Sequence, residues 1–468
     1  MAGVVASGMI ALRPYQLAAV ESARRAIAGR KRRLILLAPT AAGKTVIASG
    51  IIESAVSRGK TVLFLAHRKE LIQQASAQID AFGIDHGIIM SNHWRRRPGL
   101  QVQVASVQTL AQRALPPADL VIIDEAHLSL AKTYTDLIAA YSDAVILGLT
   151  ATPLRADGKP LGAVYQEIIP VSSVQQLMRM GFLVRPRHFA PSRPDLTKIG
   201  HKGGDYDEGQ LSDAMDKPDL IGNIVDHWRS AALGRTTAVF AVRIQHSKNI
   251  VAQFIAAGVR AEHVDGTTPA RLRDQILSRF ASGETTVVSN VGVFTEGYDN
   301  PRISAIVLAR PTESLTLYLQ MGGRGLRIHP ESGKQDCIIL DHAGCAHAHG
   351  FVDEDREWSL DGKKKRGAVK REQPVRTCDK CFAAYHAALR VCPECGYAPP
   401  VEDHEISTDE TAALVEVTDA MRLEMAKAKR REAAKAKTLE DLIALGKLRG
   451  YKPSWAYMRH RARQKRHG

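Results

Sequence analysis

A phosphate-binding loop is the first candidate for chemistry in this chain. The stretch LLAPTAAGKT, residues 36–45, ends in Gly-Lys-Thr like loops of the pattern G-x-x-x-x-G-K-[ST], but Ala38 stands where that pattern opens with glycine. An apolar run precedes the stretch and a helical pattern follows it, so the loop and helix N–H groups can point at phosphates. Lys44 is expected to reach the β- and γ-phosphates of ATP, and the Thr45 hydroxyl to bind Mg²⁺. The nucleotide-binding stretch as a whole is Thr40, Ala41, Ala42, Gly43, Lys44 and Thr45.

A pair of carboxylates provides the second half of such a site. In DLVIIDEAH, Asp124 follows four apolar residues, which places it where a strand leaves a sheet. Asp124 is expected to hold Mg²⁺ through water, and Glu125 to orient and deprotonate the attacking water. An Asp-Glu pair at this point can also be a helix N-cap followed by a first-turn acid. The upstream Lys44 loop favours the catalytic interpretation.

Four cysteines form a candidate metal site. The spacing C-x2-C-x10-C-x2-C joins Cys378, Cys381, Cys392 and Cys395, and two such pairs on turns can converge on tetrahedral Zn²⁺. An iron–sulfur cluster and free thiols are the alternatives. The chain opens without a basic secretory n-region, so we interpret the cysteines as reduced and the protein as cytoplasmic rather than disulfide-bonded and secreted.

Two blocks of alternating strand and helix patterns must position these residues. Apolar runs of strand length recur in both blocks, separated by amphipathic stretches such as residues 43–59 and 68–83, each of which ends at a glycine. Strands that alternate with helices predict an α/β fold with doubly wound parallel sheets, and ligands bind such sheets at the carboxyl ends of the strands. We expect two such domains, joined around residues 165–185. The expected strands are RLILLAP, TVLFLAH, VQVAS, DLVIIDE and AVILGLT in the first block, and TTAVFAV, AEHVDG, TTVVSN, SAIVLAR and DCIILD in the second.

The alternating pattern ends near Gly350. Residues 351–377 are expected to be a basic linker, residues 378–398 the cysteine module, and residues 399–468 a basic helical tail. The net charge of the chain is +15, and residues 421–468 hold 15 Lys or Arg against 4 Asp or Glu, so the excess lies mainly in the tail. With its Tyr and Trp residues this arm favours contact with nucleic acid. A solvated helix without a partner and a disordered solubilising arm are the alternatives. No run of eighteen apolar residues occurs, so no membrane partner is expected.

These motifs together resemble a superfamily-two helicase of the DEAD/DEAH-box type. The resemblance covers roughly residues 10–345, and Asp124–His127 matches the D-E-A-H tetrapeptide. The family often has alanine at the first loop position, which accommodates Ala38. The resemblance implies two tandem RecA-like domains, residues 1–165 and 166–350. The cysteine spacing beyond them predicts a small zinc-ribbon-like module. The type III restriction motor, DNA-repair translocase and phage helicase branches are the most similar.

The resemblance also assigns roles around ATP. LRPYQ matches the adenine-recognising element, with Gln16 on the adenine edge, and His127 would bridge the γ-phosphate and the coupling motif. Gly297 and Asp299 would lie near the ribose and Mg²⁺. QMGGRGLR matches Q-x-x-G-R-x-x-R, so Gln320 would contact the phosphate region. Arg324 and Arg327 would be arginine fingers supplied across the cleft, a role that typically contributes about 10³–10⁵ in rate. A helix with basic residues at i and i+3 is the alternative.

Further motifs imply contact with a nucleic-acid strand. AHRKEL, ASVQTL and SNVGVFTEGYDNP match backbone-contacting motifs, and we assign those contacts to Arg68, Thr109 and Thr295. GLTATP matches the coupling motif, in which Thr150 and Thr152 link the ATP site to the strand.

The expected function is that of an ATP-dependent DNA helicase or translocase. Thr-Ala-Thr in the coupling motif favours DNA, because RNA-directed branches usually carry Ser-Ala-Thr. A double-strand translocase that does not separate strands, an RNA helicase, and a non-enzymatic zinc-dependent nucleic-acid-binding protein are the alternatives. No nuclease constellation is visible, which argues against a complete restriction enzyme. Replication, repair or nuclease proteins are the candidate partners.

Overall fold

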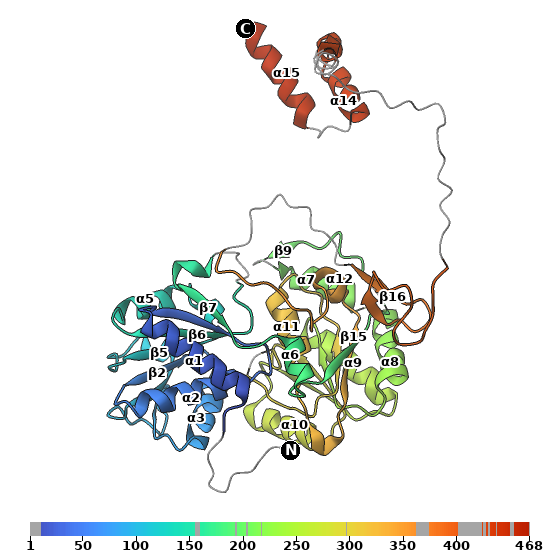
Figure 1. Cartoon of the computed structure of the whole chain (residues 1–468). Helices are drawn as coiled ribbons and strands as arrows, with labels where there is room; N and C mark the ends of the chain where they lie inside the picture. The colour runs from blue at the N-terminus through green and yellow to red at the C-terminus, as the bar shows by residue number, and fades with distance from the viewer. Residues whose placement is uncertain are drawn as a thin grey trace. The chain divides into compact units, whose positions relative to one another are not determined.

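The computed structural model shows an α/β protein with two parallel sheets, as the strand and helix patterns predict (Figure 1). It describes residues 11–154, 160–191, 194–202, 205–216, 218–295, 297–361 and 374–400. In the C-terminal region it describes residues 424, 427–428, 431–436, 438–449 and 454–467. The chain divides into two compact units, residues 1–399 and 400–468. Both sheets belong to the first unit. No described helix is long and apolar enough to cross a membrane.

The first sheet has seven parallel strands in the order β3-β4-β2-β5-β6-β1-β7. Its side chains alternate between two helix layers, as the pleat requires. Leu34 and Leu36 pack on the face covered by α1–α3, and Ile35 packs on the face covered by α4 and α5. The strands are β1 (Arg33–Leu37), β2 (Val62–Ala66), β3 (Gly87–Ile89), β4 (Val102–Ser106), β5 (Leu120–Asp124), β6 (Val145–Thr150) and β7 (Glu167–Pro170). The helices are α1 (Pro14–Ala28), α2 (Lys44–Val56), α3 (Lys69–Ala81), α4 (Val107–Leu110), η1 (Ala126–Leu128), α5 (Lys132–Ala140), η2 (Leu161–Ala163) and α6 (Val174–Arg179).

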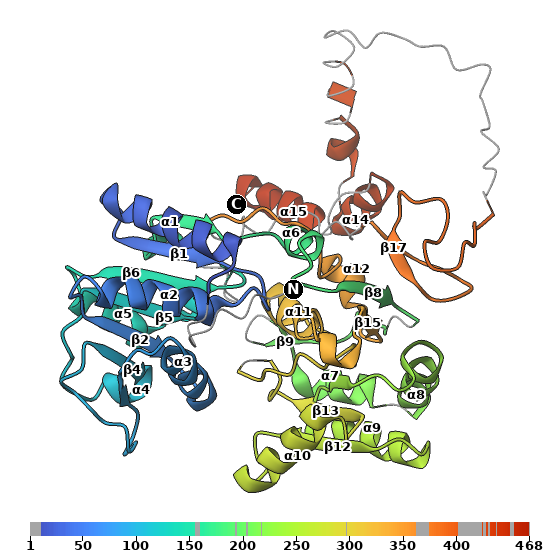
Figure 2. The same cartoon turned by 60° about the horizontal axis from the view of Figure 1, so that its bottom comes forward.

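The second sheet has six parallel strands in the order β12-β13-β11-β14-β15-β8. Helices α10 and α11 cover the face whose core is continuous with the α1–α3 face of the first sheet, and α8 and α9 cover the other (Figure 2). The strands are β8 (Arg185–Phe189), β11 (Thr237–Phe240), β12 (Ala261–Asp265), β13 (Val287–Val291), β14 (Ala305–Leu308) and β15 (Asp336–Asp341). The helices are α7 (Glu208–Met215), α8 (Pro218–Ala232), α9 (Ile244–Ala256), α10 (Ala270–Ser282), α11 (Leu315–Gly323), η3 (Pro330–Ser332) and α12 (Cys345–His349). A small hairpin pairs β9 (His201–Lys202) with β10 (Asp205–Tyr206).

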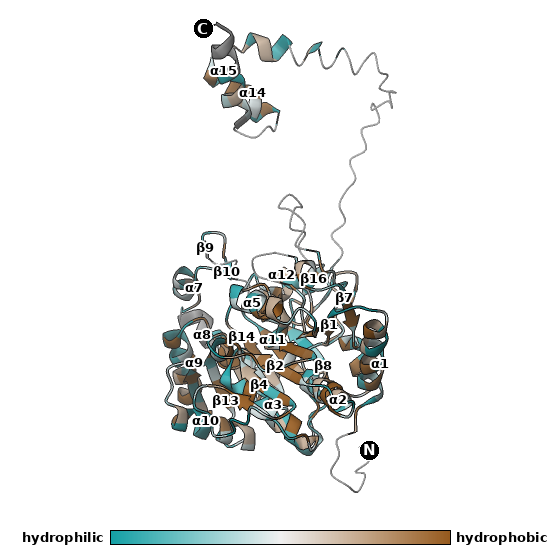
Figure 3. Ribbon diagram, turned by 90° about the vertical axis from the view of Figure 1, so that its left-hand side faces the viewer, coloured by the Kyte–Doolittle hydropathy of each residue, from teal (hydrophilic) through white to brown (hydrophobic). Residues whose placement is uncertain are grey.

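All ten expected strands are present in the two large sheets, and these sheets contain three more that were not expected. These are β3, β7 and β8, and each lies at the edge of its sheet. β7 pairs with β1, so the first sheet extends past the boundary that we expected at residue 165. The sheets are strongly apolar inside and their helices are polar outside, as Figure 3 shows by colour.

Residues 351–361, here called the return segment, run from the second sheet back to the first domain. At one end, Val352 is buried against Gly322 of α11, and the Tyr318 hydroxyl donates to the Gly350 carbonyl (2.9 Å). At the other end, the Gly162 N–H donates to the Leu360 carbonyl (3.0 Å), and Leu360 packs on the core of the first domain. The first part of the expected basic linker is therefore an ordered connection. Its residues 362–373 lie outside the described residues.

The cysteine module packs on the outer face of the second sheet. It contains the hairpin β16 (Val375–Thr377) and β17 (Ala384–His386), and Cys378, Cys392 and Tyr385 share a core with Phe189 and Trp228. The Ala190 N–H donates to the Phe382 carbonyl (2.9 Å). The second unit contains α14 (Leu439–Leu448) and α15 (Ser454–His467), where Trp455 packs against Gly446. Much of the expected helical tail lies outside the described residues.

Candidate active site

The phosphate loop has the backbone of an anion cradle. Ala41 (φ 74°) and Gly43 (φ 78°) are both left-handed, and α2 begins directly after them at Lys44. Such alternation turns successive N–H groups towards one point, where a phosphate can bind. The Ala38 N–H donates to the Thr150 carbonyl (3.0 Å), which ties the loop to the end of β6. Ala41 holds this conformation without being glycine, a strain typical of functional sites.

Gln16 lies beneath this loop, at the first turn of α1. Its side-chain amide donates to the Ala42 carbonyl (3.3 Å), and the Tyr15 hydroxyl donates to the same oxygen (3.0 Å). Both side chains are buried. A side chain at Gly43 would meet the Gln16 amide at 2.8 Å, so the glycine is needed for space as well as for its backbone angle. In this structure the Gln16 side chain therefore supports the phosphate loop. Its expected contact with the adenine edge stays a prediction.

The charged residues that we expected to be catalytic meet beyond the ends of β1 and β5. The Lys44 Nζ lies 3.0 Å from Glu125 Oε1, and His127 Nδ1 lies 3.3 Å from Glu125 Oε2. Burial opposes ionisation of Glu125, but the ammonium of Lys44 and the imidazole of His127 outweigh it and hold the pKa of Glu125 below its ordinary value. Burial, together with the charge of Glu125, raises the pKa of Asp124 to about 6. The backbone of Glu125 is left-handed (φ 50°), a second strained position at the site.

A cavity of about 420 Å³ unites the two domains around these charges. The second domain contributes Gly297 and Asp299 from the loop after β13, and Gln320, Arg324 and Arg327 from α11 and the turn after it. The residues of the first domain that we expected at the nucleotide and that line the cavity are Thr40, Ala41, Gly43, Lys44, Thr45, Asp124 and Glu125. The sequence motifs thus converge on one cleft between the sheets.

The two arginines expected to act alike are held differently. The guanidinium of Arg324 donates to three backbone carbonyls of one loop, those of Phe294 (3.0 Å), Tyr298 (2.7 Å) and Thr295 (2.8 Å). Arg327 instead forms an ion pair with Asp299. Arg324 therefore holds the loop that carries Thr295, whereas Arg327 and Asp299 lie together in the cavity wall.

Helix α3 contributes residues that the motifs did not indicate. Gln74 and Gln78 line the cavity one turn apart, and the Gln74 amide donates to the Gly297 carbonyl of the second domain. Nearby, Glu70 of α3 lies 3.7 Å from Arg273 of α10. The i, i+4 spacing of the two glutamines after AHRKEL was the available signal, but a polar helix face is equally typical of a solvent-exposed surface.

The coupling motif forms a direct contact between the domains. Thr150 and Thr152 are buried, and the Thr150 hydroxyl donates to the Thr152 carbonyl (2.8 Å). The Thr152 hydroxyl donates across the cleft to the Thr316 hydroxyl of α11 (2.9 Å). These hydrogen bonds join the end of β6, beside the phosphate loop, to the helix that leads to Arg324.

The residues expected to contact a strand lie outside the nucleotide cavity. Arg68, before α3, reaches the Gly292 carbonyl (3.5 Å), and the Thr295 hydroxyl donates to the same oxygen (3.1 Å). These two side chains therefore meet across the domains. Thr109 lies apart from them in α4, where its hydroxyl accepts the Ser91 N–H at 3.4 Å.

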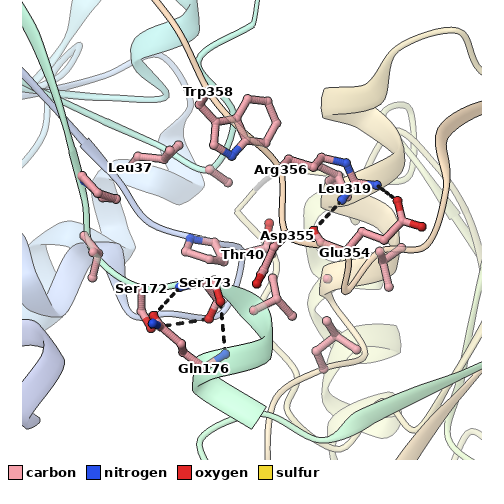
Figure 4. A pocket seen from close by; sticks show the side chains of 18 residues that line it. Leu37, Thr40, Ser172, Ser173, Gln176, Leu319, Glu354, Asp355, Arg356 and Trp358 are labelled. Atoms are coloured by element: carbon pink, nitrogen blue, oxygen red, sulfur yellow. Dashed lines mark hydrogen bonds and ion pairs between the residues drawn. The ribbon is translucent and has the colours of Figure 1, made fainter. Parts of the chain in front are cut away.

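A second cavity, of about 360 Å³, also borders the phosphate loop (Figure 4). Leu37, at the end of β1, and Thr40 of the loop line it from the first domain, and Leu319 of α11 lines it from the second. The return segment closes it with Arg356 and Trp358. The Arg356 guanidinium donates to the carbonyls of His349 (3.0 Å) and Phe351 (2.7 Å), which fixes this end of the segment on the second domain.

Comparison with known proteins places this geometry in a family. Residues 9–155 match the family model described as type III restriction enzyme, res subunit, and residues 216–329 match the helicase conserved C-terminal domain. The two matches fall on the two sheets that share the cleft. The chain belongs to the superfamily-two helicases.

Relatives of this helicase occur in viruses and in cells. A "51.5 kDa protein" of a Lactococcus phage is 31% identical over 376 residues, which is 79% of each chain. "Putative ATP-dependent helicase IRC3" of Saccharomyces cerevisiae is 31% identical over 72% of this chain, which spans 52% of that protein. "DNA 3'-5' translocase XPB2" of Sulfurisphaera tokodaii is 24% identical, over 68% of this chain and 79% of that one. Among solved structures, a fragment of "a putative HsdR subunit of a type I restriction enzyme" from Vibrio vulnificus shares the fold, with a TM-score of 0.58 and 24% identity. That match covers 71% of this helicase and 64% of the fragment.

The four cysteines of this helicase converge as their spacing predicts. Their sulfur atoms all lie within 4.8 Å of one another. The two pairs sit on matching turns, because the Cys378 N–H donates to the Ala383 carbonyl and the Cys392 N–H donates to the Tyr397 carbonyl, both at 2.9 Å. Phe382 (φ 59°) occupies the left-handed position that Gly396 (φ 72°) occupies in the second turn. Four sulfurs presented by two equivalent turns fit a tetrahedral metal ion.

Proposed function

We propose that this helicase is an ATP-dependent DNA motor that hydrolyses ATP in the cleft between its two sheets and moves along or unwinds a strand. The observation that carries the proposal is the cavity in which Lys44 and Glu125 of one domain face Arg327 and Gln320 of the other. Because neither domain holds all of these groups, hydrolysis requires the domains to be closed.

The Lys44–Glu125 ion pair suggests how hydrolysis starts. The phosphates of ATP compete with Glu125 for the Lys44 ammonium, since a phosphate carries more charge than a carboxylate. When Lys44 turns to the phosphates, Glu125 loses its main counter-charge while it stays buried. Its pKa then rises towards neutrality, which makes it a stronger base for the attacking water. Thr45 and Asp124 would hold Mg²⁺, which neutralises charge on the phosphates.

Closure of the ATP cleft also acts on the residues that we propose to contact the nucleic-acid strand. The loop that carries Thr295 is held by Arg324, and Arg324 lines the cavity proposed to bind ATP. Arg68 of the first domain meets the carbonyl of Gly292, to which Thr295 donates. A strand backbone that crosses Arg68 and Thr295 touches both domains, so opening and closing the ATP cleft displaces one contact against the other.

DNA is the strand that we propose. The coupling motif is Thr150-Ala151-Thr152, and the matching family model is that of a restriction-enzyme subunit. The translocase from Sulfurisphaera tokodaii is named for DNA. We also propose that the four cysteines bind structural Zn²⁺ and that the basic arm, including α15, adds contacts to DNA phosphates.

ATP turnover by the full chain tests this function. Turnover should be measured without nucleic acid and with single-stranded DNA, duplex DNA or RNA, at one salt concentration. Lys44→Ala and Glu125→Gln should each lower it by about 10³-fold or more. Lys60→Ala, which breaks an exposed pair with Asp119, is the matched control and should turn over normally. Wild-type turnover in either site variant would disprove the mechanism, and stimulation by RNA alone would replace DNA with RNA.

Two displacement assays then separate the modes of movement. Displacement of an annealed strand indicates unwinding. Displacement of a triplex-forming strand without strand separation indicates a double-strand translocase instead.

A further inference from the structure

Residues 90–99 form a loop at the edge of the first sheet that presents an exposed tryptophan. Trp94 is 81% exposed, whereas large apolar side chains normally bury most of their surface. The loop follows β3 and leads to β4, and near its start the backbone of Ser91 is left-handed (φ 40°). The His93 ring stacks on the indole, with centroids 5.7 Å apart and planes inclined by 27°.

The base of this loop is fixed, so Trp94 is held outward by the fold. The Arg95 guanidinium binds both carboxylate oxygens of Asp80 at 2.6 Å and donates to the His86 carbonyl (3.1 Å). The Ile88 N–H donates to the Arg95 carbonyl (2.9 Å), and the His93 N–H donates to the Met90 carbonyl (2.9 Å). Residues on both sides of Trp94 are therefore anchored while its own ring is left in solvent.

The loop is also joined to a proposed strand contact. The Ser91 N–H donates to the Thr109 hydroxyl, and the Arg113 guanidinium donates to the Ser91 carbonyl (2.8 Å). Thr109 and Arg113 lie in and just after α4, on the side of the loop where the chain leaves β3. A strand whose backbone passes Thr109 would bring its bases to this loop.

The charges around the ring favour a polyanion. Asp80 and Asp85 are the acidic groups there, and Arg95 and Arg97 pair with them. Arg96 is exposed and has no acidic partner among the described residues. With Arg113 this leaves positive charge beside an exposed aromatic face, which is the combination that binds single strands through phosphate contacts and base stacking.

We propose that Trp94 is a stacking platform for a base of single-stranded nucleic acid, with Arg96 contacting an adjacent phosphate. This inference rests on the proposed function. It adds a contact to a base, whereas Arg68, Thr109 and Thr295 are proposed to contact only the backbone. Trp94 lies outside the nucleotide cavity, so it affects how tightly the strand is held and not the chemistry of hydrolysis.

Binding of a fluorescein-labelled oligothymidylate and of an abasic strand of equal length tests the proposal. Trp94→Ala should weaken binding of the base-containing strand by about tenfold, and binding of the abasic strand hardly at all, because only the former can stack. Trp94→Phe should retain most of the affinity, whereas Trp94→Leu, apolar but without a ring, should not. Arg96→Ala should weaken both strands and reduce the salt dependence. Leu233→Ala, at another exposed apolar residue, is the control.

The results separate this inference from the proposed function. If Trp94→Ala binds the base-containing strand and the abasic strand as tightly as the wild type does, the stacking role is overturned. The proposed function is not affected by that result. An equal loss on both strands would overturn the stacking role too. If the wild-type chain binds neither strand and nucleic acid does not stimulate its ATP turnover, the proposed function itself fails. ATP turnover without nucleic acid should be the same in wild type and Trp94→Ala.

Discussion

Thr40 of the phosphate loop and Gly323 of α11 touch across the domain cleft, so closely that a β-carbon at residue 323 would lie 2.6 Å from the Thr40 β-carbon. This distance is far below an ordinary contact, and neither atom is the end of a flexible side chain. Gly323 therefore sets how near the second domain can come to the nucleotide.

Gly323→Ala should hold the cleft slightly open and lower stimulated ATP turnover by about 100-fold, since a misplacement of about 1 Å costs that much. The unfolding midpoint should change little. The double variant with Thr40→Gly removes the clash and should recover turnover relative to Gly323→Ala, with Thr40→Gly alone as the control. Normal turnover by Gly323→Ala would show that this contact does not limit closure.

The Mg²⁺ concentration that the protein needs should depend on pH through the protonation of Asp124. Its pKa is raised to about 6, so below that pH the folded protein carries a proton that Mg²⁺ must displace. The Mg²⁺ concentration for half-maximal turnover should rise about tenfold per pH unit below 6 and stay level above 7. A raised pKa also means that the ionised carboxylate destabilises the fold. Asp124→Asn should therefore raise the unfolding midpoint of the nucleotide-free chain more at pH 7.5 than at pH 5.

The two arginines that follow α11, Arg324 and Arg327, should have separable effects. Arg324→Lys cannot reproduce three hydrogen bonds to the loop of residues 294–298, because an ammonium lacks the planar fork. We expect it to lower both strand affinity and the turnover number. Arg327→Ala should lower the turnover number and leave strand affinity near wild type. The comparison requires titration of strand and ATP in each variant, and identical profiles would refute the division of roles.

Removal of the Zn²⁺ that we propose for the cysteine module should destabilise the second domain. Cys378 and Cys392 share a core with Trp228 and Phe189, so loosening their turns exposes part of that core. A chelator, or Cys392→Ser, should lower the unfolding midpoint by about 2–4 °C for each kcal/mol lost. Hydrogen exchange should increase in β8 and α8 before it increases in β1 or β5. An increase in hydrogen exchange confined to residues 374–400 would show that the cysteine module does not stabilise the second sheet.

The return segment should limit how far the domains separate. Leu360→Asp places a charge against the core of the first domain and should release that end, while Val352 stays on α11. Hydrogen exchange at Gly162 should then increase, and the ATP concentration for half-maximal turnover should rise because closure starts from a wider opening. Asp361→Asn, at the exposed neighbouring position, is the control.

The sequence predicted the central strands and most of the cavity, and it failed at the edges. Residues such as Leu34–Leu37 and Leu120–Ile123 are apolar without interruption because helices cover both of their faces. β3, β7 and β8 lie at sheet edges and are short or polar, for example Arg185–Phe189, so no such run marks them. Gln74, Thr316 and the Arg324 contacts were missed because each depends on two domains or loops that are distant in sequence.

The return segment also determines how the second sheet is connected to the first domain along the chain. The chain leaves the first domain after β7, builds the second sheet, comes back to Gly162 through Leu360, and then supplies the cysteine module to the second sheet again. The second sheet is thus an insertion, with its entry and its exit both secured on the same neighbour. A single backbone cut between β7 and β8 would not release it, and free swivelling about one linker is impossible. Two connections to the same neighbour therefore restrict how far the two sheets can rotate against each other.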